Sequence, residues 1–339
     1  MIWHIDNSFS ESLRKESERM DHSYQFRLNT STEFANSIFE ASFLINDVIF
    51  RYGFEINKSL IVSEWLFSKN EREVTLFERN GNNFEINKTA FKEGIKFKEN
   101  INENVLFLSY LAQNNQPISK IIWNWFQNVN HVSGIDDETY NNITKNLLRT
   151  DPDFKKWISA ALKFLEISSV EASEQEGDIY TFHNKYDENN LLVGSEPFTL
   201  EEESAGTKKL VQLLGPLYDT LKHGKILFLD EFDSKLHPNL SRRLVSLFHH
   251  FNKRNSQFIF SAQDASLLDK KLFRRDQIWF IEKNQFGASS LYSLSDFNSS
   301  TVRSDSAFDK KYLENNFGAA NTIEINDALM NHLYGSETK

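Results

Sequence analysis

The amino-acid sequence predicts an α/β protein in which a parallel sheet is accompanied by an antiparallel β meander and a helical insertion. Three observations carry this prediction. Apolar residues alternate roughly between residues 31 and 88, they recur at helical spacing between about 89 and 172, and helix and strand patterns alternate after residue 201. Alternating strands and helices of these lengths imply a parallel sheet in a three-layer α/β arrangement.

The N-terminal region is predicted to be an antiparallel meander. After about twenty polar residues, helical or loose, come runs with many aromatic residues, such as "FEASFLINDVIFRYGFEI" and "REVTLFERNGNNFEI". Turns are expected at Asn57-Lys58 and at Asn80-Gly81, and Asn-Gly between alternating apolar runs is a strong hairpin signal. Residues 1–88 are therefore expected to form the antiparallel part of an N-terminal lobe.

The middle region, residues 89–172, is predicted to be a helical insertion. Apolar residues recur every three or four positions in "NENVLFLSYLAQNN", "SKIIWNWFQNVN" and "PDFKKWISAALKFLEI". Asp151 followed by Pro152 is a good helix start, because the aspartate caps the first turn and proline fits the first helical position. The runs "DIYTFHNKY" and "NLLVGSEPFTL" then suggest a hairpin, at the beginning of a third region that spans 173–339.

The C-terminal region carries the α/β pattern itself. A helix is expected over "TKKLVQLLGPLYDTLK" and another over "PNLSRRLVSLFHHFNK", because leucines recur along one face of each. Between them, "ILFL" is a continuous apolar run, typical of a strand buried on both sides. Two further short strands are expected over "SQFIFSA" and "QIWFIEK".

Length and composition limit the class of protein. The 339 residues suggest about two domains, or one domain with a large insertion, and 30 Phe with 40% hydrophobic residues allow a sizeable core. The net charge of −10 disfavours a surface that is basic all over, and the absence of Cys excludes disulfides and thiolate metal sites. Neither a membrane span nor a signal peptide is evident, so we expect a soluble protein of the cytoplasm.

The strongest chemical signal is the pair of acids that ends the apolar strand. Asp230 and Glu231 follow "ILFL" directly, and ligands of parallel α/β sheets bind outside the carboxyl ends of the strands. An aspartate there can hold a magnesium ion, and the adjacent glutamate can polarise an attacking water. The plainer interpretation is a strand that ends in solvated acids.

Two weaker signals lie on either side of this strand. Ser204 and Gly206 precede an amphipathic helix, whose free N–H groups and dipole favour an anion, although an ordinary serine cap explains them equally well. Gln263 follows the next strand, and its amide could donate to a terminal phosphate or simply cap the next helix.

Taken together and in this order, these motifs resemble the C-terminal lobe of an ABC-type ATPase head. In that resemblance "SAGT" corresponds to the signature loop, "ILFLDE" to the Walker B strand, "FDSKLHP" to the D-loop and "SAQD" to the switch loop. The closer similarity is to the OLD-like and RloA-like AAA ATPases of bacterial defence and restriction-associated loci. The later runs "FRRDQIWFIEK" and "KYLENNFGA" occur in the order that is familiar from this family.

Two departures from the family pattern stand out. The family opens with a strand and a G-x-x-x-x-G-K-[ST] phosphate loop, whereas no two glycines here are five positions apart and the only Gly-Lys, Gly224-Lys225, begins the Walker B strand. Met1 is therefore interpreted as an internal or truncated start, or as one half of a split protein. In addition, Gln263 stands where the switch loop usually carries histidine, and glutamine cannot carry a proton at neutral pH.

The resemblance implies a P-loop NTPase fold of the ABC type that binds ATP and Mg²⁺ between two heads. It assigns magnesium to Asp230, water activation to Glu231 and the γ-phosphate to Gln263. The nucleotide of the opposite subunit would be reached by Ser204 and Gly206 of the signature loop. Asp233, in the D-loop, would relay between the two sites, and Thr207 and Asp233 are also assigned to cofactor binding.

A head dimer of this kind is expected to gate a partner effector, which we expect to be a nuclease, in an anti-phage or restriction-associated system. The alternative is a dimerisation or regulatory module that keeps the fold and has lost turnover, because the phosphate loop is missing. Direct nucleic-acid binding is least favoured, given the acidic balance.

Overall fold

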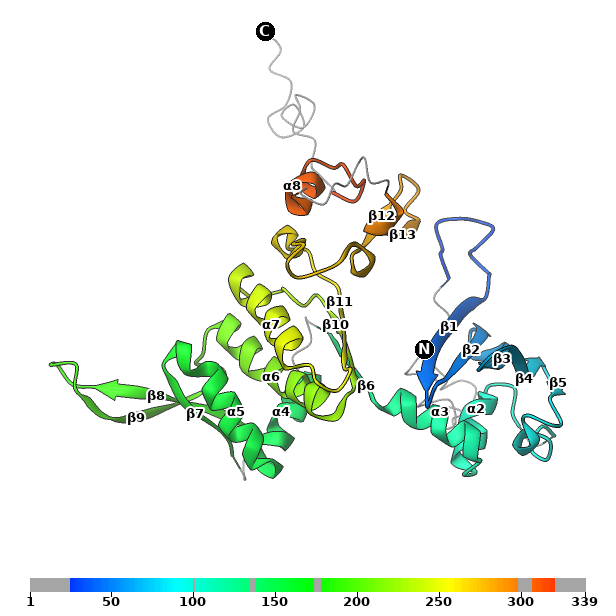
Figure 1. Ribbon diagram of the computed structural model, residues 1–339, viewed down its shortest axis with the longest axis horizontal. Helices are drawn as coiled ribbons and strands as arrows, with labels where there is room; N and C mark the ends of the chain where they lie inside the picture. Colours follow the sequence, from blue (N-terminus) through cyan, green and yellow to red (C-terminus); the bar gives the residue numbers. More distant parts are fainter. Residues whose placement is uncertain (1–24, 100, 134–137, 174–177, 298–306, 321–339) are drawn as a thin grey trace, which may run out of the picture. The chain divides into compact units, whose positions relative to one another are not determined.

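A computed structural model describes residues 25–99, 101–133, 138–173, 178–297 and 307–320 (Figure 1). The chain divides into two compact units, and the second is made of 133–214, 230–252 and 260–339. The expected α/β class, with an antiparallel meander and helices, is confirmed. The expectation for the first twenty residues falls outside the described residues. Among the helices of the described ranges, none combines the length and the apolar character needed to cross a bilayer.

The first unit contains the predicted meander, a five-stranded antiparallel sheet whose strands follow one another in chain order. Both predicted turns are confirmed, because Lys58 and Gly81 adopt the left-handed backbone that tight turns require, with φ of 52° and 55°. The strands are β1 (Ser37–Ile45), β2 (Val48–Asn57), β3 (Leu60–Lys69), β4 (Glu73–Asn80) and β5 (Asn83–Ile86).

Helices α2 (Phe107–Gln113) and α3 (Pro117–Gln127) supply the rest of this core. Side chains from one face of the meander, such as Tyr52 and Phe77, are fully buried with residues of both helices. The ring of Phe77 meets that of Phe107 edge to face, with centroids 5.2 Å apart. Aromatic pairs in this arrangement add to the stability gained from burial alone.

A buried carboxylate joins the meander to the start of α2. Glu64 is 0% exposed and accepts hydrogen bonds from the backbone N–H groups of Phe107 (2.7 Å) and Leu108 (2.9 Å) and from the Tyr52 hydroxyl (2.9 Å). The guanidinium of Arg79 lies 3.6 Å away. Burial raises the pKa of Glu64, although these partners act in the opposite direction. Glu64 thus caps a helix whose first N–H groups would otherwise lack partners.

A parallel sheet is present as predicted and has three strands, in the order β11-β10-β6. Strand β6 was not predicted, because it lies in the region expected to be helical. Hydrogen bonds join the beginnings of neighbouring strands, from Ile226 N to Asn128 O (3.2 Å) and from Gln257 N to Lys225 O (3.1 Å). The strands therefore run parallel. Their bounds are β6 (Val129–Ser133), β10 (Ile226–Asp230) and β11 (Gln257–Phe260).

Burial along β10 differs from the expectation of a strand covered on both faces. Leu227 and Leu229 are buried, but Ile226 and Phe228 are partly exposed. One face of the strand is therefore covered more completely than the other.

The second unit contains α4 (Glu138–Thr150), α5 (Pro152–Leu162) and an antiparallel sheet of three strands. Asp151 caps α5 as predicted, since its carboxylate accepts from the N–H groups of Asp153 and Phe154. The predicted hairpin is also present and extends away from α4 and α5 (Figure 1). The strand that precedes the hairpin was not expected, because its apolar residues continue the pattern of α5 in the sequence. The strands are β7 (Ile167–Ala172), β8 (Ile179–Tyr186) and β9 (Leu192–Thr199).

The two predicted C-terminal helices are α6 (Ala205–His223) and α7 (Pro238–Phe251). The leucines of the α6 stripe are buried up to Leu217. After α7 and β11, the strand predicted over "QIWFIEK" is β12 (Trp279–Lys283), which pairs antiparallel with β13 (Ser289–Ser293) in a sheet of its own. A short helix, α8 (Phe308–Leu313), packs its buried Phe308 in the same small core as Phe280 of β12.

Candidate functional site

The acids that follow β10 are fixed by a serine at the end of β11. The Ser261 hydroxyl hydrogen-bonds Oδ1 of Asp230 and also accepts from the backbone N–H of Glu231, at 2.8 Å. The backbone N–H of Phe232 in turn donates to the carbonyl of Ser261, at 2.9 Å. One hydroxyl therefore sets both the orientation of the Asp230 carboxylate and the path of the chain into Glu231.

The main chain of Glu231 is held in a conformation that side-chain-bearing residues seldom adopt. Its φ is 49°, in the left-handed region, where a non-glycine residue carries strain. Its carbonyl accepts hydrogen bonds from Nζ of Lys209 (3.1 Å) and from the N–H of Ser234 (3.1 Å). Within the described part of the chain, its carboxylate has no hydrogen-bond partner. The backbone is thus fixed while the acid remains available to a ligand.

Asp233 fastens the loop after β11 to the same segment. Its Oδ2 accepts from the backbone N–H groups of Gln263 (3.0 Å) and Asp264 (2.6 Å). The residues before these two loops also pack together, since the ring centroids of Phe232 and Phe260 lie 4.8 Å apart. The backbone of Gln263 is held in this way, and its side chain is exposed.

The small residues before α6 lie next to the same segment. The Ser204 hydroxyl accepts from the backbone N–H of Thr207 at 3.1 Å, the geometry of an ordinary helix cap. Gly206 faces Lys235, and a Cβ on this glycine would lie 3.1 Å from the Lys235 carbonyl oxygen. A side chain at position 206 would therefore press on the turn that follows β10.

The sequence-predicted residues fall into two groups. In the first group, the Ser261 hydroxyl joins Asp230 to the backbone of Glu231, and the Asp233 carboxylate binds the backbone of Gln263. The second group lies at the start of α6, and two of its neighbouring contacts reach the segment after β10. Gly206 approaches Lys235, and Lys209 binds Glu231. Within the chain, the hydrogen bond of Ser204 is that of an ordinary helix cap, which is the plainer of the two interpretations.

Two residues of the network were not identified from the sequence. Ser261 stands in the quoted run "SAQD", and a hydroxyl directly after the strand next to Asp230 is the signal that could have found it. Lys209 lies four positions before Leu213, on the buried stripe of α6, so a lysine there breaks the apolar pattern.

The acids suit a magnesium ion that is bound mainly by phosphate and water. Asp230 is exposed and, among the described residues, only its Oδ1 is engaged, which leaves Oδ2 for a ligand. Mg²⁺ is typically held through one or two carboxylates together with substrate phosphates. In the ranges described, no group of three or more His, Asp or Glu residues forms a metal cage. The free Oδ2 of Asp230 therefore fits a magnesium ion that is also bound by phosphate.

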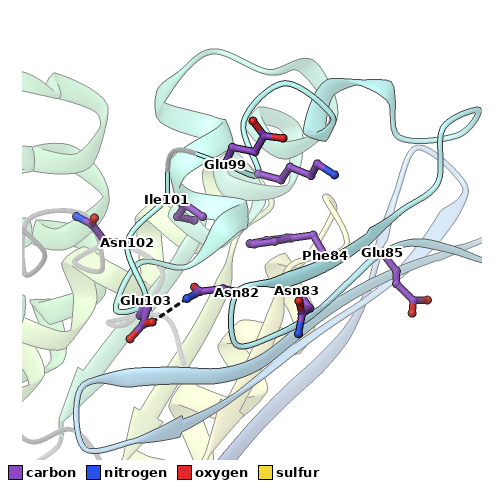
Figure 2. Close-up of a pocket in the computed structure, with 9 residues that line it drawn as sticks. Asn82, Asn83, Phe84, Glu85, Glu99, Ile101, Asn102 and Glu103 are labelled. Carbon is purple, nitrogen blue, oxygen red and sulfur yellow. Dashed lines mark hydrogen bonds between the residues drawn. The ribbon is translucent and has the colours of Figure 1, made fainter.

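A separate cavity of about 640 Å³ lies in the first unit, between the β4–β5 turn and the loop before α2. Asn82 donates to Glu103 across its edge, at 2.8 Å. Figure 2 shows that Glu85, Glu99 and Glu103 point in different directions, so they do not converge on one cation. None of the sequence-predicted site residues lines this cavity.

Among solved structures, the chain is similar to the SMC head domain from Thermotoga maritima, at 14% identity and a TM-score of 0.37, covering 76% of this chain and 74% of that one. It is also similar to an SMC head bound to the C-winged helix domain of ScpA, at 15% identity and a TM-score of 0.35, covering 74% and 69% of the two chains. No curated protein sequence matches.

A family match covers most of the chain. The family described as "AAA domain, putative AbiEii toxin, Type IV TA system" matches residues 6–269, which include β10, the loop after β11 and the start of α6. The chain therefore belongs to this family of AAA domains.

Proposed function

We propose that the protein is the ATP-binding and ATP-hydrolysing subunit of an ABC-like head dimer. The observation that carries the proposal is the network around Ser261, which holds Asp230 and Glu231 at the carboxyl end of a parallel sheet and leaves both acids accessible. Ligands of such sheets bind at this edge. Membership of an AAA family supports the same chemistry.

In this proposal the chain's own residues divide the work. The free oxygen of Asp230 helps to hold Mg²⁺, which would neutralise charge on the β- and γ-phosphates. The carboxylate of Glu231 accepts a hydrogen bond from the attacking water and orients it toward the γ-phosphorus. The exposed amide of Gln263 donates to an oxygen of the terminal phosphate. Asp233 keeps that amide in place, because it binds the backbone of the same loop.

The start of α6 is assigned to a second copy of the head. Ser204 precedes and Thr207 lies in the first turn of a 19-residue helix, where N–H groups and the helix dipole favour a phosphate. Gly206 keeps the approach free of a side chain. We propose that these three residues contact the nucleotide held by the partner head, so that ATP is enclosed only in the dimer.

The proposed cellular role is supported by the family match and by the resemblance to OLD-like and RloA-like ATPases. The family description names a toxin of a type IV toxin–antitoxin system. We propose a cytoplasmic, anti-phage or restriction-associated system in which closing of the heads gates an effector, such as a nuclease.

A second candidate is a dimerisation or regulatory module that keeps the fold without turnover. It is favoured by the sequence itself, which contains no G-x-x-x-x-G-K-[ST] loop. The amides and lysine of such a loop supply much of the grip on the phosphates. The ordinary serine cap at Ser204 fits this candidate equally well.

Hydrolysis of Mg-ATP by the wild type and by Glu231→Gln separates the two candidates. The substitution removes the base but keeps the side-chain shape, so hydrolysis should fall by about 10²–10⁴-fold while ATP binding persists. Glu196→Gln is the matched control, since Glu196 is an exposed acid paired with Lys185 on the β8–β9 hairpin. Equal rates in all three proteins, or no binding at millimolar ATP, would reject the enzyme and support the module.

A further inference from the structure

Lys209 is a buried lysine close to the candidate site. Its side chain lies on the second turn of α6, the residue is 1% exposed, and its Nζ donates to the carbonyl oxygen of Glu231 at 3.1 Å. Lysine is almost never fully buried unless its charge is compensated, because removing an ammonium from water is costly.

The atom that Lys209 binds belongs to a residue whose backbone is strained. Glu231 has a left-handed backbone, and the direction of its carbonyl is coupled to the direction of its side chain through the same Cα. Its N–H is bound by Ser261, so the lysine completes the restraint from the opposite side of the residue. Without the ammonium, the strained peptide would lose one of the groups that hold it.

A second contact ties the same helix to the same segment. Gly206 approaches the carbonyl of Lys235, which also has a left-handed backbone, with φ of 62°. Gly206 and Lys209 are three positions apart and thus on one face of α6. The beginning of the helix therefore touches the segment after β10 at both of its left-handed residues.

We propose that Lys209 is a positioning residue that couples the first turns of α6 to the Glu231 backbone and thereby aims its carboxylate. This inference rests on the proposed function. Because the start of α6 is assigned to the nucleotide of the partner head, a shift of the helix on nucleotide contact would move the Glu231 peptide through Lys209. Occupancy of one site would then set the geometry of the acid in the other.

The test compares Lys209→Met, Lys209→Arg and the control Lys208→Met in the full chain. Methionine keeps the length of the side chain without a donor, and arginine restores a donor. Lys208 is the adjacent lysine and pairs with Glu201, outside the network. Steady-state Mg-ATP hydrolysis and hydrogen exchange of residues 230–236 are measured for each protein.

The proposal expects Lys209→Met to lower kcat by about 10–100-fold with KM unchanged, as misplacement of a reacting group does. It also expects faster exchange within 230–236, and arginine should recover part of both effects. Lys208→Met should match the wild type. Loss of kcat and KM together, no recovery by arginine, or unchanged exchange in Lys209→Met would overturn the proposal.

The exchange measurement needs no nucleotide. If the wild type neither binds nor hydrolyses ATP, the proposed function fails, and yet faster exchange in Lys209→Met would still show that the lysine holds this segment. If hydrolysis is present and Lys209→Met behaves as the wild type in both measurements, only the role of Lys209 fails.

Discussion

Glu64 in the meander and Glu231 after β10 are both glutamates in constrained surroundings, yet their carboxylates differ in burial and in hydrogen-bond partners. Glu64 is fully buried, and its oxygens face two backbone N–H groups, a tyrosine hydroxyl and a guanidinium. Glu231 is partly exposed, and the hydrogen bonds described for it engage its backbone and leave the carboxylate open. The oxygens of Glu64 are therefore occupied by partners within the chain, whereas those of Glu231 remain able to accept hydrogen bonds from a ligand.

The difference gives a physical criterion for a candidate functional acid. A carboxylate whose partners all come from its own chain stabilises local structure, here the start of α2. A carboxylate on a strained and firmly held backbone, with free oxygens, can act on a ligand. Strain of this kind persists only where the surroundings enforce it.

The largest expected effect is on stability, from removal of the buried acid. Glu64→Ala should lower the free energy of unfolding by about 3–5 kcal/mol, because the first N–H groups of α2 would lose their acceptor and the buried Arg79 would lose its opposite charge. Glu78→Ala, at an exposed position of β4, should change it by less than about 0.5 kcal/mol. Chemical denaturation measures both, and a small effect of Glu64→Ala would erase the contrast between the two glutamates.

The next effect is on hydrolysis. Ser261→Ala removes the hydroxyl that joins Asp230 to the Glu231 backbone, so turnover should fall by about 10–100-fold. Stability should change by only about 1 kcal/mol, the usual net value of one hydrogen bond. Ser261→Thr keeps a hydroxyl and should retain most of the activity. Full activity in Ser261→Ala would mean that the serine does not organise the acids.

A smaller effect should appear at the strained residue itself. Glycine adopts the left-handed region freely, so Glu231→Gly should be more stable than Glu231→Ala by about 1 kcal/mol, although both lose the base. Thermal or chemical unfolding of the two variants measures the difference. If alanine is the more stable of the two, the backbone at position 231 is not strained.

The smallest effect concerns an ion pair next to the loop after β11. The side-chain hydrogen bond from Arg242, at 2.5 Å, is the main reason that the pKa of Asp269 lies below its usual value of 3.8. A lowered folded-state pKa means that the pair stabilises the fold above about pH 3.8 and loses this contribution as the pH falls through the folded-state value. Both side chains are partly exposed, so Asp269→Asn should cost at most about 1 kcal/mol at neutral pH.

The gap in unfolding free energy between the wild type and Asp269→Asn should therefore narrow as the solution is acidified below about pH 4. A gap that is constant between pH 3 and pH 7 would show that Asp269 is not coupled to Arg242.

Much of the architecture could be predicted because its signals are local. The helical stripe of α6, the Asn80-Gly81 turn and the cap at Asp151 each depend on a few neighbouring residues. The strand β7 escaped prediction, because its apolar residues continue the helical pattern of α5. The pairing of β12 with β13 also escaped, since strand partners are not encoded in the pattern of either strand.

The candidate site was predicted only in part. Asp230 and Gln263 could be placed near one another because parallel strands end at the same edge of a sheet. The left-handed backbone of Glu231 and the burial of Lys209 depend on tertiary contacts. A lysine in an amphipathic helix ordinarily lies in solvent, so its pattern alone gives no reason to bury it.

The central claim is that the segments 204–207, 230–236 and 261–264 serve one nucleotide site, while the Glu64 cluster serves only the fold. Hydrogen exchange of the full chain with and without millimolar Mg-ATP tests it most directly. The account predicts slower exchange in all three segments together and unchanged exchange at 64 and 107–108. Protection confined to the meander, or the same exchange in all three segments with and without Mg-ATP, would contradict it.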